Sequence, residues 1–460
     1  MRWLLLLLLA VAAPLAAKDD AGDDAGEAPV EIAVERSGDR WVATFAFPSD
    51  EPGWSFVRSN RASELDGSWR LASWHSETPG VELVRIGERD VLQATHGTVP
   101  RSVRVTFEPF AQDIYADYDP ALIFSDGTVA LFTGHFAVSP WRADAAEQTG
   151  GPPTALTFAN ADGRLVYRGL AYDSVSMRDE ETYVLFGSPH FVSTPHFVGL
   201  LDPQIPEWMR SELDDFLPRA MDGLAERLGE PDLRGKPMIL ASWAGPTPGG
   251  ISRGGSVLDG IVTLRFEGEG MLERQVDEIH PVRWFLAHEA AHFWLGQTVA
   301  HRDRTQAWIS EGGASLLAYR LIAAIDPAYE PGFDLAKDWQ DCLDLSAGGA
   351  LRDADTRRDY RANYACGAVL GMIAEGAAQA NGSRDFFDFW RSLIDANRKD
   401  AGGDGIVSTA DWIAQVTAES QDPSLAADLY AFIHHGAHDP AGALCGMLGK
   451  VGRSAPGCPR

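Results

Sequence analysis

Two histidines with a glutamate between them are the residues of this chain most suited to chemistry. His288 and His292 lie four positions apart in the apolar stretch of residues 284–295. On a helix this spacing places both imidazoles on one face, where both can bind one zinc ion. Glu289 is rotated by about 100° from His288, so it cannot be an equivalent ligand, but it can take a proton from a water molecule at the metal. Two histidines that merely pack on a core helix are the alternative.

A third ligand is expected because a catalytic zinc site takes three protein ligands and leaves a fourth position open. Glu311 is the candidate, because it is the one charged residue in the apolar residues 308–319, where a charge is costly unless it is paired or bound to metal. The polar residues 297–306 supply a turn between this helix and the first one, which we expect to begin near Pro281. The sequence therefore predicts one zinc ion per chain, bound by Glu311 and the two histidines.

The pattern HExxH, followed by eighteen residues and a glutamate, resembles the membrane alanyl aminopeptidase family of gluzincin zinc metallopeptidases. The likeness extends to Trp294, Gly296, Trp308 and the Glu-Gly-x-Ala sequence that begins at Glu311, so it covers about thirty residues strongly. The resemblance implies zinc-dependent hydrolysis of peptide bonds, with a peptide as the substrate. It also implies a thermolysin-like catalytic domain, in a short member that lacks the helical-repeat domain of larger relatives.

The same resemblance points to a catalytic tyrosine. The family uses a tyrosine in a Tyr-x-x-Gly context, downstream of the metal ligands, to donate a hydrogen bond to the oxyanion of the tetrahedral intermediate. Tyr364, with Gly367 three residues later, looks like this element, and Tyr360 is the alternative. Glu289 and Tyr364 are therefore the expected catalytic residues.

One departure from the family concerns the end of the substrate. Family aminopeptidases carry a Gly-Ala-Met-Glu-Asn loop upstream of the HExxH helix, whose glutamate binds the free amino group. The corresponding residues 249–260 contain no glutamate, and Arg253 would repel an amine. The backbone of this glycine-rich loop can still pair with an extended peptide, and Asp259 is the candidate replacement for the lost carboxylate. The predicted substrate-binding residues are Gly254, Gly255, Ser256 and Asp259.

The altered loop leaves the substrate open. An aminopeptidase-like metallopeptidase is the favoured interpretation. An endopeptidase or a hydrolase of another amide is one alternative, and a catalytically inactive binding module on the same fold is another. Because no ligand and no general base is missing from the sequence, we favour an enzyme.

The composition restricts the compartment and the partners. Asp and Glu number 66 against 39 Lys and Arg, and the resulting net charge of −27 disfavours nucleic acid and anionic lipid as partners. A positive residue, an apolar run and small residues are typical of a signal peptide over residues 1–17, and a disordered acidic leader follows over residues 18–28. We expect an exported protein, periplasmic or secreted, without stable membrane insertion after signal cleavage. An uncleaved anchor is the alternative.

The four cysteines are even in number, as expected for two disulfides in an exported protein. Their connectivity does not follow from the sequence, but proximity favours Cys342 with Cys366 and Cys445 with Cys458. No CxxC spacing is present, so the cysteines are not expected to bind metal.

The elements that must position these residues fall into two domains. Short runs of Val, Phe and Ala, such as residues 41–47, predict a β-rich N-terminal domain over residues 29–200. A helical pattern, two strands and further helices predict a thermolysin-like, mostly helical α+β catalytic domain over residues 201–440. Residues 441–460 form a C-terminal tail, which the second disulfide would tie down.

Histidines outside the motif rank lower as ligands. His301 falls in the polar turn between the two helices and is expected to be solvated. His434, His435 and His438 have no acidic partner at ligand spacing, so an exposed loop is expected there.

Overall fold

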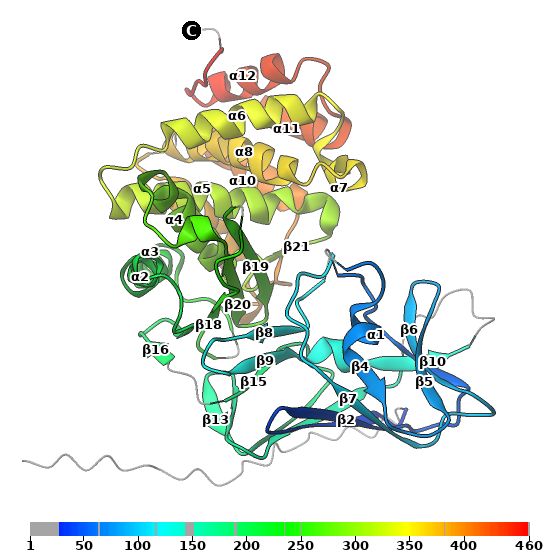
Figure 1. Cartoon of the computed structure of the whole chain (residues 1–460). Helices are drawn as coiled ribbons and strands as arrows, with labels where there is room; N and C mark the ends of the chain where they lie inside the picture. Colours follow the sequence, from blue (N-terminus) through cyan, green and yellow to red (C-terminus); the bar gives the residue numbers. More distant parts are fainter. Residues whose placement is uncertain are drawn as a thin grey trace, which may run out of the picture.

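The computed structural model describes residues 27–458, except 63–64, 116, 143–150, 188–190, 234, 249 and 381. The predicted signal peptide, residues 1–17, and most of the predicted leader lie outside the described residues. Within them, no helix combines the length and the apolar character needed to cross a membrane. The described chain has a β-rich N-terminal part and a mostly helical C-terminal part (Figure 1), which confirms the predicted fold class. The boundaries at residues 200 and 440 stay predictions.

Three sheets make up the N-terminal part. Their strand orders are β14-β11-β1-β2-β7-β4, β10-β3-β6-β5 and β13-β12-β15-β9-β8. Alternation along β1 buries Val30, Ile32 and Val34, as the period of two in a half-buried strand requires. The strands are β1 Val30–Ser37, β2 Arg40–Ala46, β3 Gly53–Phe56, β4 Trp74–Ser76, β5 Val81–Ile86, β6 Arg89–Ala94, β7 Ser102–Phe107, β8 Ala121–Ile123, β9 Val129–Phe132, β10 Val138–Trp141, β11 Thr154–Asn160, β12 Leu165–Tyr167, β13 Leu170–Tyr172, β14 Ser174–Arg178 and β15 Tyr183–Phe186, with helix α1 at Trp69–Ser73.

A five-stranded sheet opens the C-terminal part, in the order β16-β17-β18-β20-β19. Strands β17, β18 and β20 run parallel, whereas β19 pairs antiparallel with β20 and forms the edge. An edge strand keeps unpaired backbone groups that a further strand can use. The strands are β16 Phe191–Ser193, β17 Val198–Leu201, β18 Met238–Trp243, β19 Ser252–Leu258 and β20 Ile261–Glu267, and β21 (Ala300–His301) and β22 (Ile406–Val407) pair farther along the chain.

Helices stack on this sheet in the order α4, α5, α8 and α6 (Figure 1). Helices α5 and α8 are apolar nearly all round, as expected for helices in the middle of a core. The helices are α2 Glu207–Ser211, α3 Leu217–Leu228, α4 Val276–Ala291, α5 Trp308–Ile325, α6 Gly332–Ser346, α7 Ala354–Arg357, α8 Arg361–Ala380, α9 Phe386–Asn397, α10 Thr409–Ser420, α11 Pro423–His435 and α12 Pro440–Lys450.

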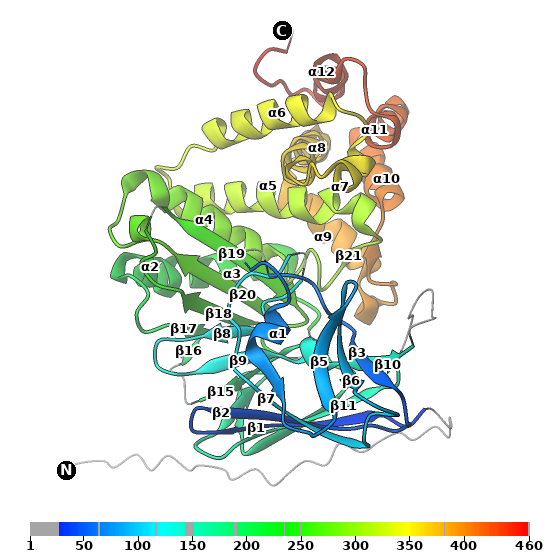
Figure 2. The same cartoon turned by 45° about the vertical axis from the view of Figure 1, so that its right-hand side comes forward.

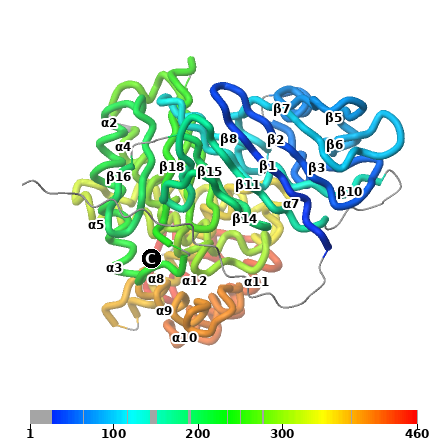
Figure 3. Tube along the Cα trace, turned by 90° about the horizontal axis from the view of Figure 1, so that it is seen from below, coloured from blue at the N-terminus to red at the C-terminus, as the bar shows by residue number. Residues whose placement is uncertain are grey.

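The two parts share a buried apolar cluster. Leu122 of β8 and Leu185 of β15 belong to it together with Leu240 of β18. Figure 2 and Figure 3 show β8 and β15 next to β18, so one sheet of the N-terminal part packs against the C-terminal sheet. This packing fixes the β-rich part relative to the C-terminal sheet.

The predicted C-terminal tail contains a packed helix. Most of α12 falls within residues 441–460, and its Leu444 and Met447 are buried in the core of the helical part. The disulfide between Cys445 and Cys458 is present, so the expected tie is confirmed.

Candidate active site

Helix α4 carries the HExxH residues and begins earlier than expected. It starts at Val276, so Pro281 lies inside the helix and the predicted start near Pro281 is wrong. Tertiary contacts hold the additional turn: the Glu278 carboxylate lies 2.9 Å from the Arg253 guanidinium, and the ring of His280 packs on that of Tyr329 at 4.7 Å. Helix α4 ends at Ala291, and His292 is its C-cap residue, so both histidines of the motif lie at the end of one helix.

Three ligand atoms converge between α4 and α5. The Nε2 atom of His288 lies 3.2 Å from Nε2 of His292 and 3.2 Å from Oε2 of Glu311, and His292 Nε2 lies 3.5 Å from the same oxygen. Zinc bonds of about 2.0–2.1 Å at tetrahedral angles place ligand atoms about 3.3 Å apart. The triad therefore fits a zinc ion, and within the described ranges it is the one such group of three metal-ligating side chains.

Outer hydrogen bonds orient both imidazoles. The Nδ1–H of His292 donates to the carbonyl oxygen of Leu295 at 2.8 Å. The hydroxyl of Ser315 donates to the carbonyl of Glu311, so its oxygen accepts from His288 Nδ1 at 3.4 Å. Because Nδ1–H is directed to these acceptors in both rings, Nε2 is the nitrogen of each ring that is left to bind a metal once its proton is released.

The charges in the triad show why it suits a cation. Burial opposes charge on His292, but the Glu311 carboxylate outweighs it and raises the pKa of His292 to about 9. Burial likewise opposes ionisation of Glu311, but the charge of His292 and hydrogen bonds to both histidines hold its pKa well below the usual value. A proton shared among converging ligands can be replaced by a metal ion, which releases it.

His301 also belongs to this region, so the expectation that it is solvated is wrong. The side chain is half-buried, and Nδ1 lies 2.9 Å from the hydroxyl oxygen of Ser310, the residue before Glu311. Burial lowers the pKa of His301. The residue therefore braces the first turn of α5, and its place in the loop between the ligands was the only signal of this in the sequence.

Glu289 lies against the edge strand. A Cβ atom on Gly255 of β19 would stand 2.8 Å from Cδ of Glu289, so a side chain at this position would displace the carboxylate. Burial raises the pKa of Glu289, while the neighbouring imidazoles of His288 and His292 lower it. The group is placed between the metal ligands and the strand, as a general base for a bound substrate requires.

Tyr364 reaches the triad because two glycines let α5 and α8 touch. A Cβ atom on Gly312 would stand 2.2 Å from the backbone of Gly367, and one on Gly367 would stand 2.3 Å from the carbonyl oxygen of Trp308. This crossing brings the turn that carries Tyr364 next to Glu311, and the Tyr364 ring stacks on that of His288 at 5.5 Å. Gly367 was singled out in the sequence as part of a motif, and its role here is to permit this contact.

Burial is the main cause that raises the pKa of Tyr364, and the carboxylates of Glu311 and Glu289 add to it. The phenol therefore stays protonated and can donate a hydrogen bond. Tyr360, the alternative, is 50% exposed, and its phenol interacts with that of Tyr115 of the N-terminal part, which raises the pKa of Tyr360. The geometry favours Tyr364.

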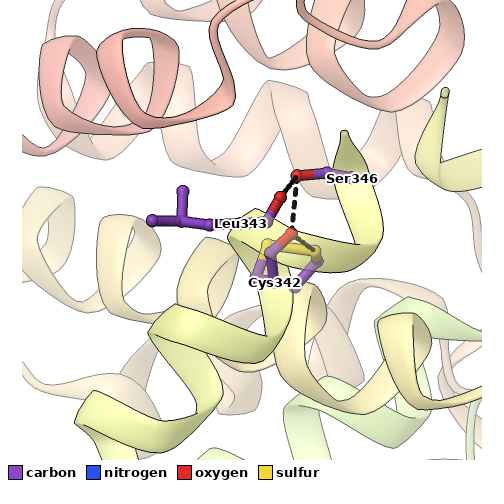
Figure 4. Close-up of a disulfide and its surroundings, with 4 residues drawn as sticks. Cys342, Leu343 and Ser346 are labelled. Carbon is purple, nitrogen blue, oxygen red and sulfur yellow. Dashed lines mark hydrogen bonds between the residues drawn. A yellow bond between two sulfur atoms is a disulfide. The ribbon is translucent and has the colours of Figure 1, made fainter. Parts of the chain in front are cut away.

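A disulfide ties α8 to α6 beside this tyrosine. Cys366, two residues after Tyr364, is bonded to Cys342. This is the predicted pairing, and it is confirmed. The hydroxyl of Ser346 donates to the carbonyl of Cys342 at 2.6 Å (Figure 4), which anchors the same end of α6.

The predicted substrate residues separate into two groups. Gly254, Gly255 and Ser256 lie on β19, and Gly255 touches Glu289 as described above. Asp259 lies in the turn after β19, is 53% exposed, and places its Oδ2 4.0 Å from the Arg168 guanidinium of the N-terminal part. The structure therefore does not bring Asp259 to the triad, because the side chain faces the other domain from the far end of the strand.

The remaining histidines lie elsewhere. His434 and His435 end α11, where both rings pack on Tyr430, so the expectation of an exposed loop is wrong for these two residues. A groove of about 300 Å³ between β8 and the ends of β18 and β20 also lies apart from the triad. Arg265, which lines it, pairs in register with Gly254, so the groove is on the face of the sheet opposite Glu289.

Comparisons with known proteins bear on the fold. No protein-family model matches the chain, and no curated protein matches its sequence. Among solved structures, an aminopeptidase N family protein from Idiomarina loihiensis is similar with a TM-score of 0.60 at 10% identity, over 90% of this chain and 78% of that one. Native leukotriene A4 hydrolase from Saccharomyces cerevisiae is similar with a TM-score of 0.50 at 13% identity, over 90% and 68%. The yeast hydrolase in complex with bestatin gives 0.50 at 12%, over 93% and 72%. The chain therefore has the fold shared by these proteins.

Proposed function

We propose that the chain is a zinc-dependent metallopeptidase, a divergent member of the membrane alanyl aminopeptidase family, with one zinc ion bound by His288, His292 and Glu311. The observation that carries the proposal is the convergence of their ligand atoms at 3.2–3.5 Å. The shared fold supports the family, and the outer hydrogen bonds support the ligand roles. The two disulfides suit an exported, periplasmic or secreted protein, because disulfides persist in oxidising compartments.

The residues around the triad would divide the chemistry. Zinc, when bound, supplies a Lewis acid and lowers the pKa of water. Glu289 takes a proton from the attacking water and delivers it to the leaving amine. Tyr364 donates its phenolic hydrogen to the developing oxyanion, which a rigid donor stabilises more than a mobile one. The contact of α5 with α8 and the disulfide at Cys366 keep this donor in place.

An extended peptide would bind on the edge of β19. The carbonyl of Val257 points away from β20, since it accepts a hydrogen bond from Tyr118 of the N-terminal part at 3.1 Å. Orientation alternates along an antiparallel strand, so the N–H and C=O groups of Gly255 and Arg253 also point outward. These groups can pair with a substrate whose scissile bond lies beside Glu289. No carboxylate of β19 is available for the substrate amine, so the reaction is aminopeptidase-like with an altered end subsite.

Turnover of a peptide library by the full chain tests the proposal. We expect a chelator to abolish cleavage and added zinc to restore it. Glu289→Gln should keep its zinc by elemental analysis and lose cleavage by about 10³-fold, within the range for general acid-base catalysis. The exposed Glu330→Gln is the matched control and should behave as the wild type. Near-wild-type activity of Glu289→Gln would rule out the general base. No zinc-dependent cleavage of any peptide would favour a binding module or a hydrolase of another amide.

A further inference from the structure

Two tyrosines of the N-terminal part reach the two walls of the proposed cleft. The hydroxyl of Tyr118 donates to the carbonyl oxygen of Val257 on β19 at 3.1 Å. The phenol of Tyr115 interacts with that of Tyr360, four residues before Tyr364 on the helical side, and this interaction raises the pKa of Tyr360. The connection between β7 and β8, cyan in Figure 1, rises from the β-rich part toward the helices at this place. Together the two contacts link the β-rich part to β19 and to the segment just before α8.

Tyr118 is held rigidly from its own domain. Its ring lies 4.8 Å from that of Phe132, and the Arg58 guanidinium lies 5.6 Å from its centroid. Its carbonyl accepts a hydrogen bond from Nε2 of the buried His135 at 2.8 Å. Because the β-rich part also shares an apolar cluster with the C-terminal sheet, Tyr118 is a fixed obstacle on the strand edge and not a mobile side chain.

Tyr115 is anchored through its backbone and leaves its ring exposed. Its N–H donates to the carbonyl of Arg61 at 2.9 Å, and its own carbonyl accepts from the Asn60 amide at 3.1 Å. Tyr115 is 60% exposed, and Tyr360 is 50% exposed. Two exposed tyrosines, one from each part of the chain, therefore interact beside the start of the helix that carries Tyr364.

The charges at this end do not suit an amino group. Facing α4, β19 presents in turn Arg253, Gly255 and Val257, of which none is acidic. Asp117, next to Tyr118, is only 2% exposed and is paired with Arg58. The end of the cleft is therefore lined by aromatic, aliphatic and ion-paired groups.

We propose that Tyr115 and Tyr118 are a stop that closes the cleft at its Val257 end, so that this chain selects the end of a peptide by length and not by the charge of its α-amino group. The inference rests on the proposed peptidase function. Two residue steps separate Gly255 from Val257, and a strand rises roughly 3.3 Å per residue. A peptide that pairs antiparallel with β19 has its amino end toward Val257. The cleft therefore accepts about two residues on the amino side of the scissile bond, and an acetyl group can take the place of the outer one.

Three peptides, each with one cleavable bond, test this. The first has two residues before the bond and a free amino end, the second has one acetylated residue before the bond and so a similar length, and the third has four residues before the bond. On the full, zinc-loaded chain we expect kcat/KM for the first two to agree within about threefold and that for the third to be lower by at least about 30-fold, as a 2 kcal/mol steric penalty would give. Tyr115→Ala, which removes an exposed ring without touching the core, should raise cleavage of the four-residue peptide at least tenfold. Tyr118→Phe should raise it less, because its ring remains. Tyr430→Ala, an exposed tyrosine far along the chain, is the matched control.

Different outcomes overturn different statements. If cleavage strictly required the free amino end, the cleft would recognise charge and the inference would be overturned. The same would hold if this requirement disappeared in the variant of an exposed carboxylate, Asp113→Asn. Equal cleavage of all three peptides would overturn it as well. Phosphinic peptides of the same three lengths, which bind zinc without being cut, give the same length limit as an affinity. If the phosphinic peptides showed this length limit in their affinities but no peptide were cleaved, the result would support the stop at Tyr115 and Tyr118 and overturn the proposed peptidase function.

Discussion

The two walls of the cleft are built in opposite ways. On the helical wall, His288, His292 and Glu311 are each held by a hydrogen bond or by a helix crossing, so their positions leave little freedom. On the strand wall, Gly254 and Gly255 have no side chains, and a Cβ atom on Gly254 would meet nothing within 4 Å. Chemistry needs side chains fixed to within a fraction of an ångström, whereas an extended peptide needs only free backbone groups.

The contrast predicts two kinds of defect. A change on the helical wall should remove the metal or the reaction for every substrate. A change on the strand wall should leave the metal bound and alter the reaction through the substrate or through Glu289, which faces this strand. Four variants, in order of decreasing effect, test whether the walls are separable in this way.

Removal of one ligand should have the largest effect. We expect His292→Ala to lose zinc by elemental analysis and all peptide turnover with it, because two ligands hold zinc far less tightly than three. His435→Ala, at the exposed end of α11, should keep one zinc per chain. Stoichiometric zinc in His292→Ala would contradict the ligand set and the character assigned to the helical wall.

The glycine crossing beneath Tyr364 should tolerate no side chain. In Gly312→Ala the added Cβ would stand 2.2 Å from the Gly367 backbone, so the helices must separate. We expect a loss of about 3 kcal/mol in the free energy of unfolding by urea, together with most of the activity. Gly446→Ala, in an exposed turn of α12 with nothing within 4 Å, should instead stabilise by up to about 1 kcal/mol. Equal effects of the two changes would mean that helix propensity, and not the crossing, governs the result.

On the strand wall, Gly255→Ala should displace the general base without releasing the metal. Its Cβ would stand 2.8 Å from Cδ of Glu289, and a shift of about 1 Å in a catalytic group costs on the order of 10²-fold in rate. Zinc content should be unchanged. Gly254→Ala, whose Cβ faces open space on the other side of the sheet, should lose less. A larger loss in Gly254→Ala would place the substrate on the opposite face of β19.

The smallest effect on turnover is expected from the disulfides. Replacing both members of the Cys342–Cys366 pair by serine opens a loop of 24 residues, and the same change at Cys445–Cys458 opens one of 13. Each double variant should lower the free energy of unfolding by about 3 kcal/mol. Only the first should also lower kcat, by about threefold to tenfold, because Cys366 lies on the helix of the proposed oxyanion donor. An unchanged kcat would show that the glycine crossing positions Tyr364 without help from the disulfide.

Sequence reasoning reached the candidate ligands because their spacing is local. The distance of four residues in His288 and His292 has one consequence on a helix, and a lone carboxylate at Glu311 in an apolar helix needs a cation nearby. The fold class also followed from the sequence, because strands and helices repeat their apolar residues with periods of two and 3.6, and these periods can be recognised in short segments of the chain.

Other features depend on contacts between distant segments, which no local period records. The brace of His301 on Ser310, the early start of α4 and the separation of Asp259 from the triad all follow from what the rest of the chain places beside them. The bridge from Tyr115 and Tyr118 to the cleft is the extreme case, because it joins residues more than a hundred positions apart.

The sequence by itself determined which side chains are able to bind zinc and accept a proton, since those abilities belong to residue types and to their spacing along one helix. Only the tertiary structure decided that Gly312 meets Gly367, that Gly255 faces Glu289, and that Tyr118 from the β-rich part contacts the free edge of β19. The reason is physical: ligand chemistry is a local property, whereas the shape of a cleft is a sum of packing choices made across the whole chain.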